Sequence, residues 1–369
     1  MLNRIQLELK KRKDTASLRS LKTTEGLVDF CSNDYLGLAR SVELQNEFQI
    51  KLQVDAPLGS GGSRLLSGNY NGIEKLESYL SNFFSAEKAL IFNTGYVANL
   101  AVFSTLPTRH DTVIYDELIH TCIKDGVNLS NAHKLSFRHN DINDLDKKLN
   151  KAQGDKFVAI ESIYSMDGDE APLVEIIKVC KKHKAYIIID EAHSTAIIGD
   201  KGEGLVVSQD LQDEFTLRTY TFGKGVGAHG SCVVGDSIII DYLINFARPF
   251  IYTTAMPQHS ITVIHNAFEY LKKHSNLRDK LNVNIKLFKA NIQQKTIKST
   301  SPIQAVIVPT NERVQALCKT LQNKGYDVRP VMSPTVAKGS ERIRICIHSY
   351  NTSTEIIGLS NIINNELRP

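Results

Sequence analysis

The sequence predicts a large α/β domain with a mainly parallel sheet, followed by a small α+β domain. Short apolar segments of strand length alternate with amphipathic helical segments over most of the 369 residues, a pattern typical of parallel sheets covered by helices on both faces. The pattern changes near residue 285. We therefore expect an N-terminal helix and strand segment over residues 1–40, a large domain over 41–285 and a small domain over 286–369.

The expected elements place the ends of several strands next to unusual polar peptides. In the large domain the predicted strands cover residues 88–93, 112–115, 157–161, 185–190 and 216–222, and predicted helices cover 96–106 and 172–183. In the small domain we expect strands over 303–308 and 342–347 and helices over 312–324 and 354–367. Ligands of open α/β sheets bind beyond the carboxyl ends of the strands, so functional residues are sought there.

The composition argues against several classes of protein. The chain is 42% hydrophobic and 23% charged, as in soluble globular proteins, and its apolar segments are far shorter than a membrane span. The first residues lack the apolar core of a signal peptide. The six cysteines form no C-x-x-C pair, which favours reduced thiols over disulfides or a zinc site. We therefore expect a cytoplasmic protein with no metal and no membrane partner.

Positive charge is concentrated at the N-terminus. The formal net charge is +4, and residues 1–22 contain seven Lys or Arg against two acidic residues. A basic terminal helix is usually a solvated face, and nothing else indicates a nucleic-acid partner. Contact with an acidic carrier protein is the alternative use of this segment.

Lys224 follows a predicted strand and lies among three glycines in the peptide Thr221–Gly227. Glycines allow a sharp turn and the close approach of a planar ligand. Desolvation at such a place favours the neutral, nucleophilic amine that imine formation needs. On this peptide alone, an ordinary lysine beside a turn is an equally good interpretation.

A second strand end carries Asp190, Glu191 and His193. A carboxylate there can bind a protonated pyridine nitrogen and so strengthen a pyridine cofactor as an electron sink. His193 can then contact the phenolic oxygen of the same ring. The D-E-A-H peptide also occurs in helicases, but that interpretation requires a G-x-x-x-x-G-K-[ST] peptide, which the chain does not contain.

Other strand ends offer a phosphate site and contacts to the ring. The turn at Asn93–Tyr96 ends one strand and begins a helix, so backbone N–H groups and the helix dipole point to one place. Thr221 can add a hydroxyl to the phosphate, Ser165 can offer one to the ring, and His120 can stack on the ring face. A lone histidine in this position is more often structural.

Seven peptides resemble the α-oxoamine synthase family, whose members are fold-type I enzymes that use pyridoxal 5′-phosphate (PLP). The resemblance extends over nearly the whole chain. The peptides are Cys31–Leu38, Gly59–Arg64, Ser165–Asp169, Asp190–His193, Thr221–Gly225, Ile251–Pro257 and Pro334–Arg344. The resemblance implies a PLP fold-type I large domain and a homodimer with its active site at the subunit interface.

The resemblance also implies a role for each matching residue. Lys224 would hold PLP as a Schiff base and later take the α-proton of the amino acid, and Asp190, His193 and His120 would be the other catalytic residues. The remaining cofactor residues would be Gly95, Tyr96, Ser165, Thr221 and Thr253, the last one from the partner subunit. The substrates would contact Arg19, Asn33, His120, Thr335 and Arg344, of which Asn33 and Arg344 would hold a carboxylate.

Members of this family condense an amino acid with an acyl thioester and release CO2. Gly59–Arg64 most resembles the members of biotin biosynthesis, which join L-alanine to a pimeloyl group carried by coenzyme A or a carrier protein. Glycine C-acetyltransferase and serine palmitoyltransferase activities are the alternatives within the family. An alternative of another class is a non-catalytic partner subunit. The presence of both Lys224 and Asp190 argues against this alternative.

Overall fold

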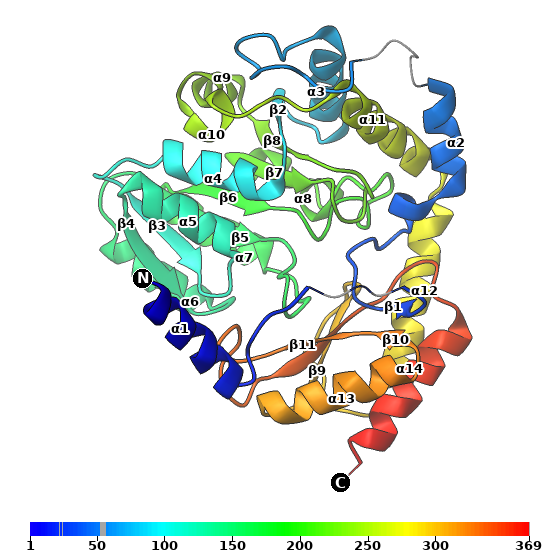
Figure 1. Ribbon diagram of the computed structural model, residues 1–369. Helices are drawn as coiled ribbons and strands as arrows, with labels where there is room; N and C mark the ends of the chain where they lie inside the picture. Colours follow the sequence, from blue (N-terminus) through cyan, green and yellow to red (C-terminus); the bar gives the residue numbers. More distant parts are fainter. Residues whose placement is uncertain (22, 24, 52–56, 369) are drawn as a thin grey trace. The chain divides into compact units, whose positions relative to one another are not determined.

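The computed structural model describes residues 1–21, 23, 25–51 and 57–368 (Figure 1). The chain divides into two compact units, each of which is described by itself. The larger unit consists of Leu36–Tyr164 and Glu170–Arg278, and the smaller of Met1–Tyr35, Ser165–Asp169 and Asp279–Pro369. Residues 1–35 thus belong to the same unit as the C-terminal part of the chain. The expected division at residues 40 and 285 treats these two parts as separate segments.

A seven-stranded sheet forms the centre of the larger unit. Its strand order is β2-β8-β7-β6-β5-β3-β4. All neighbouring pairs from β7 to β4 are parallel, whereas β8 is antiparallel to both of its neighbours. The strands are β2 (Lys88–Phe92), β3 (Thr112–Asp116), β4 (His133–Phe137), β5 (Lys156–Glu161), β6 (Tyr186–Asp190), β7 (Leu217–Thr221) and β8 (Ser231–Gly235).

The sheet confirms the predicted α/β class, and the five predicted strands match β2, β3, β5, β6 and β7 within one residue at each end. The sequence patterns do not predict β4 and β8. Four of the five residues of β4 are exposed or half-buried, so no apolar run marks this edge strand. In β8 only Cys232, Val233 and Val234 are apolar between a serine and a glycine, which is shorter than the usual strand signal.

Apolar side chains cover both faces of this sheet, because successive residues of a strand point to opposite sides. Ile188 of β6 belongs to the core on one face, and its neighbour Ile189 belongs to the core on the other. The first core includes residues of α4 (Gly95–Thr105), α5 (Thr121–Ser130) and α9 (Ser237–Phe246), and the second includes residues of α6 (Ile142–Lys151) and α7 (Leu173–His183) (Figure 1). The other helices of this unit are α2 (Val42–Lys51), α3 (Asn71–Phe83), α8 (Leu205–Ser208), α10 (Arg248–Ile251) and α11 (Gln258–Lys273).

The carboxyl ends of β5, β6 and β7 meet at one edge of the sheet. Glu161 pairs with Asp190 in parallel register, and Asp190 pairs with Thr219. The segments that leave these three strands therefore start side by side. Asp190 and Lys224 lie at or just beyond this edge, as expected for a ligand site of an open α/β sheet.

The smaller unit contains a three-stranded antiparallel sheet with the order β11-β12-β9. Helix α13 (Asn311–Asn323) packs against β11, β12 and α14 (Ser353–Glu366) (Figure 1). Helix α14 begins with a capping box formed by Thr352 and Glu355. The predicted strands and helices of this part match within one residue at each end. The remaining elements are β1 (Val28–Asp29), β9 (Ile303–Ile307), β10 (Tyr326–Asp327), β11 (Arg329–Val331), β12 (Arg342–Cys346), α1 (Leu2–Asp14) and α12 (Asn276–Asn291).

Two properties of the helices bear on possible partners. Helix α1 has no buried residue. Within the described part of the chain, every helix is too short or too polar to pass through a membrane.

Candidate active site

Lys224 lies three residues after β7, and its side chain contacts a histidine that follows β6. The distance between Lys224 Nζ and His193 Nε2 is 2.9 Å. Lys224 is half-buried and His193 is buried. The loop turns just after the lysine, where Gly227 has a φ of +65° and donates its N–H to the Lys224 carbonyl; this left-handed conformation favours glycine. The structure therefore brings two of the predicted catalytic residues into direct contact.

The carboxylate of Asp190, the last residue of β6, is held at both oxygens. Oδ1 accepts the backbone N–H of Ala192 at 2.8 Å, and Oδ2 accepts Nδ2 of Asn99 at 2.6 Å. Asp190 is only 7% exposed. Since a carboxylate can accept further hydrogen bonds on each oxygen, a ligand N–H can still bind to it.

Asn99, which donates this bond from helix α4, is not among the site residues that the sequence predicts. Asn99 is 1% exposed and lies four residues after Gly95, on the same side of the helix. Its helical neighbours Ala98 and Ala101 are buried apolar residues. A single polar side chain on the apolar side of a helix is the signal that identifies such a residue, because buried amides need a partner.

Helix α4 begins at the turn that we expect to bind a phosphate. Thr94 caps the helix, and its hydroxyl accepts a backbone N–H of the first turn at 3.2 Å. A Cβ atom on Gly95 would collide with Oγ1 of Thr221, so the helix start and this hydroxyl lie close together. Because the first N–H groups of a helix have no partner within it, they attract anions. Gly95 and Thr221, two of the predicted phosphate residues, therefore lie next to each other. The phenol of Tyr96, the third, donates to Asp125.

His120 directly precedes α5, and its ring is oriented by Cys122. Nδ1 of His120 accepts the Cys122 backbone N–H at 3.3 Å and lies 2.9 Å from Cys122 Sγ. Desolvation lowers the pKa of His120; the charge of Asp190 opposes this shift, and the charge of Lys224 adds to it. The neutral ring is therefore favoured, which suits stacking on a flat cofactor.

Glu161, the last residue of β5, is a buried acid that sequence analysis also misses. It is 3% exposed, and its Oε1 accepts the backbone N–H of His120 at 2.6 Å. Burial raises the pKa of Glu161 to about 8, the charge of Asp190 contributes to the same shift, and Lys224 opposes it. Near neutral pH the group is therefore mostly protonated, so it supports the His120 segment without adding a second negative charge beside Asp190.

Arg344 of β12 is surrounded by neutral acceptors in the smaller unit. Its Nε donates to the Ser165 carbonyl at 2.7 Å, and its Nη2 donates to Oδ1 of Asn33 at 3.0 Å. Its Nη1 lies 2.9 Å from Sγ of Cys346. These neutral contacts orient the guanidinium but do not neutralise it, and the fork of an arginine matches a carboxylate. The structure thus brings together Arg344, Asn33 and Ser165, three of the predicted site residues.

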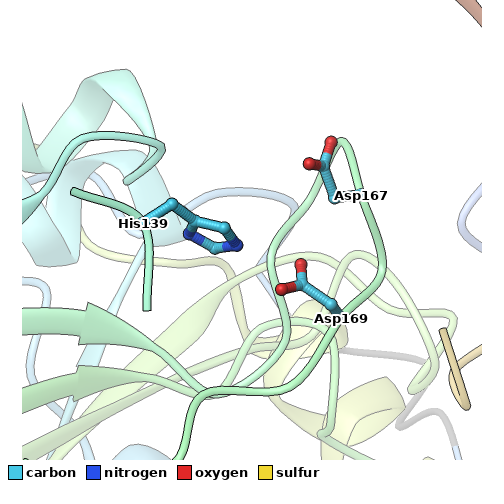
Figure 2. A group of neighbouring side chains, drawn as sticks. All are labelled: His139, Asp167 and Asp169. Atoms are coloured by element: carbon cyan, nitrogen blue, oxygen red, sulfur yellow. The ribbon is translucent and has the colours of Figure 1, made fainter. Parts of the chain in front are cut away.

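The segment that contains Ser165 also carries two acidic side chains. Figure 2 shows Asp167 and Asp169 on the same loop. Asp167 forms an ion pair with Arg342, the residue two positions before Arg344 on β12. Because residues two apart on a strand point to the same face, this ion pair flanks the Arg344 side chain.

The Gly59–Arg64 loop and the segment that carries Thr253 lie side by side in the larger unit. The guanidinium of Arg64 donates to both carboxylate oxygens of Glu77 at 2.8 and 2.9 Å. Ser60 Oγ donates to the Ala255 carbonyl at 2.6 Å. Thr253 is half-buried and lines a small cavity of about 10 Å³ that Arg64 also lines. These contacts fix the loop and place Thr253 against it.

The other two predicted substrate residues, Arg19 and Thr335, are exposed in the smaller unit. The backbone N–H of Thr335 donates to the Met332 carbonyl at 2.8 Å. Within the described residues, no hydrogen bond joins either side chain to Arg344. Their roles stay predictions from the resemblance.

Residues 25–358 match the family described as Aminotransferase class I and II. The chain belongs to this family. Among its relatives, the 8-amino-7-oxononanoate synthase of Emericella nidulans is 37% identical, with 96% of this chain and 93% of the relative covered. The 8-amino-7-oxononanoate synthase of Marinobacter nauticus is 36% identical, with 89% of this chain and 84% of the relative covered.

A solved structure also aligns with almost the whole chain. It is a serine palmitoyltransferase variant from S. paucimobilis with bound PLP and myriocin. It has a TM-score of 0.88 and 27% identity, and 98% of this chain and 96% of that chain are covered. Together these similarities confirm the resemblance to α-oxoamine synthases and the PLP fold-type I class of the large domain.

Proposed function

We propose that this protein is an acyltransferase that uses PLP to condense L-alanine with a pimeloyl thioester. The products are 8-amino-7-oxononanoate, CO2 and the free thiol, as in biotin biosynthesis. Two relatives of that name cover most of the chain at 37% and 36% identity. The observation that carries the proposal is the cluster of Lys224, His193 and Asp190 at adjacent strand ends.

The residues of the larger unit fit PLP at each of its polar groups. The space next to Gly95 and Thr221 offers backbone N–H groups and a hydroxyl to the phosphate. Asp190, with both oxygens oriented, fits a protonated ring nitrogen, and His193 fits the phenolic oxygen. When bound, PLP supplies the electron sink that makes the α-proton of the amino acid acidic.

Lys224 is the residue that anchors the cofactor and then moves a proton. Its Nζ lies 2.9 Å from His193 Nε2, a distance at which the two groups share a hydrogen bond. With cofactor and amino acid bound, Nζ would be the general base that takes the α-proton. His120, whose neutral ring is favoured, would stack on the face of the cofactor ring and hold its position.

Arg344 and Asn33 bind the carboxylate of the amino acid. The guanidinium is already oriented by the Ser165 carbonyl and Asn33 Oδ1, so little side-chain entropy is lost on binding. In the overall reaction a bond forms between the alanine α-carbon and the thioester carbonyl carbon. The carbon–sulfur bond breaks, the thiol leaves, and the carboxylate departs as CO2.

The proposal includes a homodimer in the cytoplasm, in which Thr253 of one subunit contributes to the cofactor site of the other. The family resemblance supports the dimer. The Thr253 segment is also held against the Gly59–Arg64 loop by the hydrogen bond from Ser60 Oγ to the Ala255 carbonyl. Whether the acyl carrier is coenzyme A or a carrier protein is decided by comparing the two thioesters as substrates.

A titration of the visible absorption of the bound cofactor tests the amino acid. We expect alanine to shift the band at lower concentration than glycine or serine, and pimeloyl thioester then to release thiol and CO2. Lys224→Ala protein serves as the inactive control. If serine or glycine shifts the band and supports thiol release while alanine does not, the assignment of alanine as the substrate is wrong. Serine with palmitoyl thioester is the second candidate, because a serine palmitoyltransferase has the same fold with a TM-score of 0.88.

A further inference from the structure

We propose that Asn99 is a positioning residue that fixes the Asp190 carboxylate for the ring nitrogen of PLP. This inference rests on the proposed function only in so far as the protein binds PLP. The amino acid and acyl thioester do not enter into it. Asn99 acts through Asp190 and touches neither substrate.

The geometry around Asn99 joins α4 to the end of β6. Nδ2 donates to Asp190 Oδ2 at 2.6 Å and to Cys122 Sγ at 3.3 Å. Asn99 is 1% exposed and Cys122 is 2% exposed, so water does not compete for these bonds. With Ala192 N–H on the other oxygen, the plane of the carboxylate has one orientation.

The carbonyl oxygen of the same amide gives a second, independent observation. Oδ1 of Asn99 is buried and, within the described residues, accepts no hydrogen bond. Turning the amide over would place this oxygen against the carboxylate, two acceptors facing each other. A buried acceptor without a partner is unfavourable and calls for an explanation. The explanation here is that the donation to Asp190 takes precedence over satisfying Oδ1.

Helix α4 thereby serves both ends of the cofactor. Gly95 begins the helix at the phosphate end, and Asn99 follows one turn later on the same side. A rigid helix thus sets the spacing between the phosphate site and the acid that receives the ring nitrogen.

The test compares PLP with its 1-deaza analogue, in which a carbon replaces the ring nitrogen. Full-length protein freed of cofactor is titrated with each compound. We expect Asn99→Leu, which keeps the side-chain size but has no donor, to weaken PLP binding about tenfold, and to change binding of the deaza analogue by less than about twofold. In an Asp190→Asn background, the Asn99→Leu change should no longer affect PLP binding.

Asn266→Leu is the matched control, because Asn266 is also 1% exposed and lies on a helix of the same unit, α11. It should affect both compounds equally. Equal losses for PLP and the deaza analogue in Asn99→Leu would overturn the proposal, since they would mean a merely structural role. If Asn99→Leu does not fold, Asn99→Ala is titrated with the same two compounds. Its loss of affinity for PLP is again compared with its loss of affinity for the deaza analogue.

The outcome is separate from that of the proposed function. A protein that binds PLP but prefers serine to alanine leaves the inference intact. If the unchanged protein binds PLP and the deaza analogue equally well, the role of Asn99 is refuted while a different assignment of the substrates stays open. Protein that binds no PLP refutes both.

Discussion

Glu161 and Asp190 are paired in parallel register at the ends of adjacent strands, and the two acids differ in what surrounds them. Asp190 receives N–H donors on both oxygens. Glu161 is buried with a pKa raised to about 8. One acid therefore suits a cationic ring nitrogen, while the other supports the backbone of His120.

The raised pKa of Glu161 predicts a stability that depends on pH. In the folded protein the pKa is about 8, against 4.5 for the ordinary group, so between these values the folded state binds more protons than the unfolded state. The contribution of the protonated acid is fully present below about pH 4.5 and is lost as the pH rises through about 8. For a difference of one bound proton, the free energy of unfolding changes by at most about 1.4 kcal/mol per pH unit.

Glu161→Gln should therefore flatten the pH dependence of the free energy of unfolding between about pH 5 and 8. The amide still offers an oxygen to the His120 N–H but does not titrate. Urea unfolding at several pH values measures this, with the exposed Glu175 of α7 changed to Gln as the control. Identical pH profiles for Glu161→Gln and the unchanged protein would contradict the prediction.

Lys224→Ala should lower kcat by about a thousandfold or more, because it removes both the covalent anchor of the cofactor and the general base. The same change should let the cofactor be lost on gel filtration. Thiol release and the absorbance of the desalted protein measure the two effects. Lys178→Ala, on the exposed face of α7, is expected to leave both unchanged, and a Lys224→Ala protein with full activity would refute the assignment.

Gly95→Ala should weaken both folding and PLP binding, because the added Cβ meets Oγ1 of Thr221. Overpacking of this kind costs about 1–3 kcal/mol. Thermal unfolding and PLP titration measure the two effects. Adding Thr221→Ala removes the atom that the Cβ meets, so the double variant should regain stability but not affinity for PLP. A double variant no more stable than Gly95→Ala would argue against this contact.

Arg344→Lys should raise the KM for alanine about tenfold, or ~1.4 kcal/mol, since a lysine cannot offer the paired donors of the guanidinium. The KM for the acyl thioester should change much less. Steady-state kinetics with each substrate varied in turn measure this difference. The control is Arg313→Lys on an exposed position of α13. Equal changes in both KM values would indicate a general disturbance of the smaller unit.

Local patterns in the sequence were sufficient to predict the strands that build the centre of the larger sheet. Runs such as Ile187–Ile189 are apolar throughout because both faces of the sheet are covered. The edge strand β4 escaped prediction because its exposed side chains carry no such run. Polar residues directly after buried strands likewise identified Asp190, His193 and Lys224.

By itself, the sequence determined the α/β class, the order of the elements and the residues at the ends of the strands. It could do so because the burial of an element produces a local pattern of apolar residues in the sequence. Only the tertiary structure decided which of these residues meet. Asn99 and Asp190 are 91 positions apart, and their hydrogen bond depends on how α4 packs against the sheet. The same holds for Glu161 and His120, 41 positions apart. Contacts of this kind produce no local pattern in the sequence, since each partner is placed by the packing of a different element.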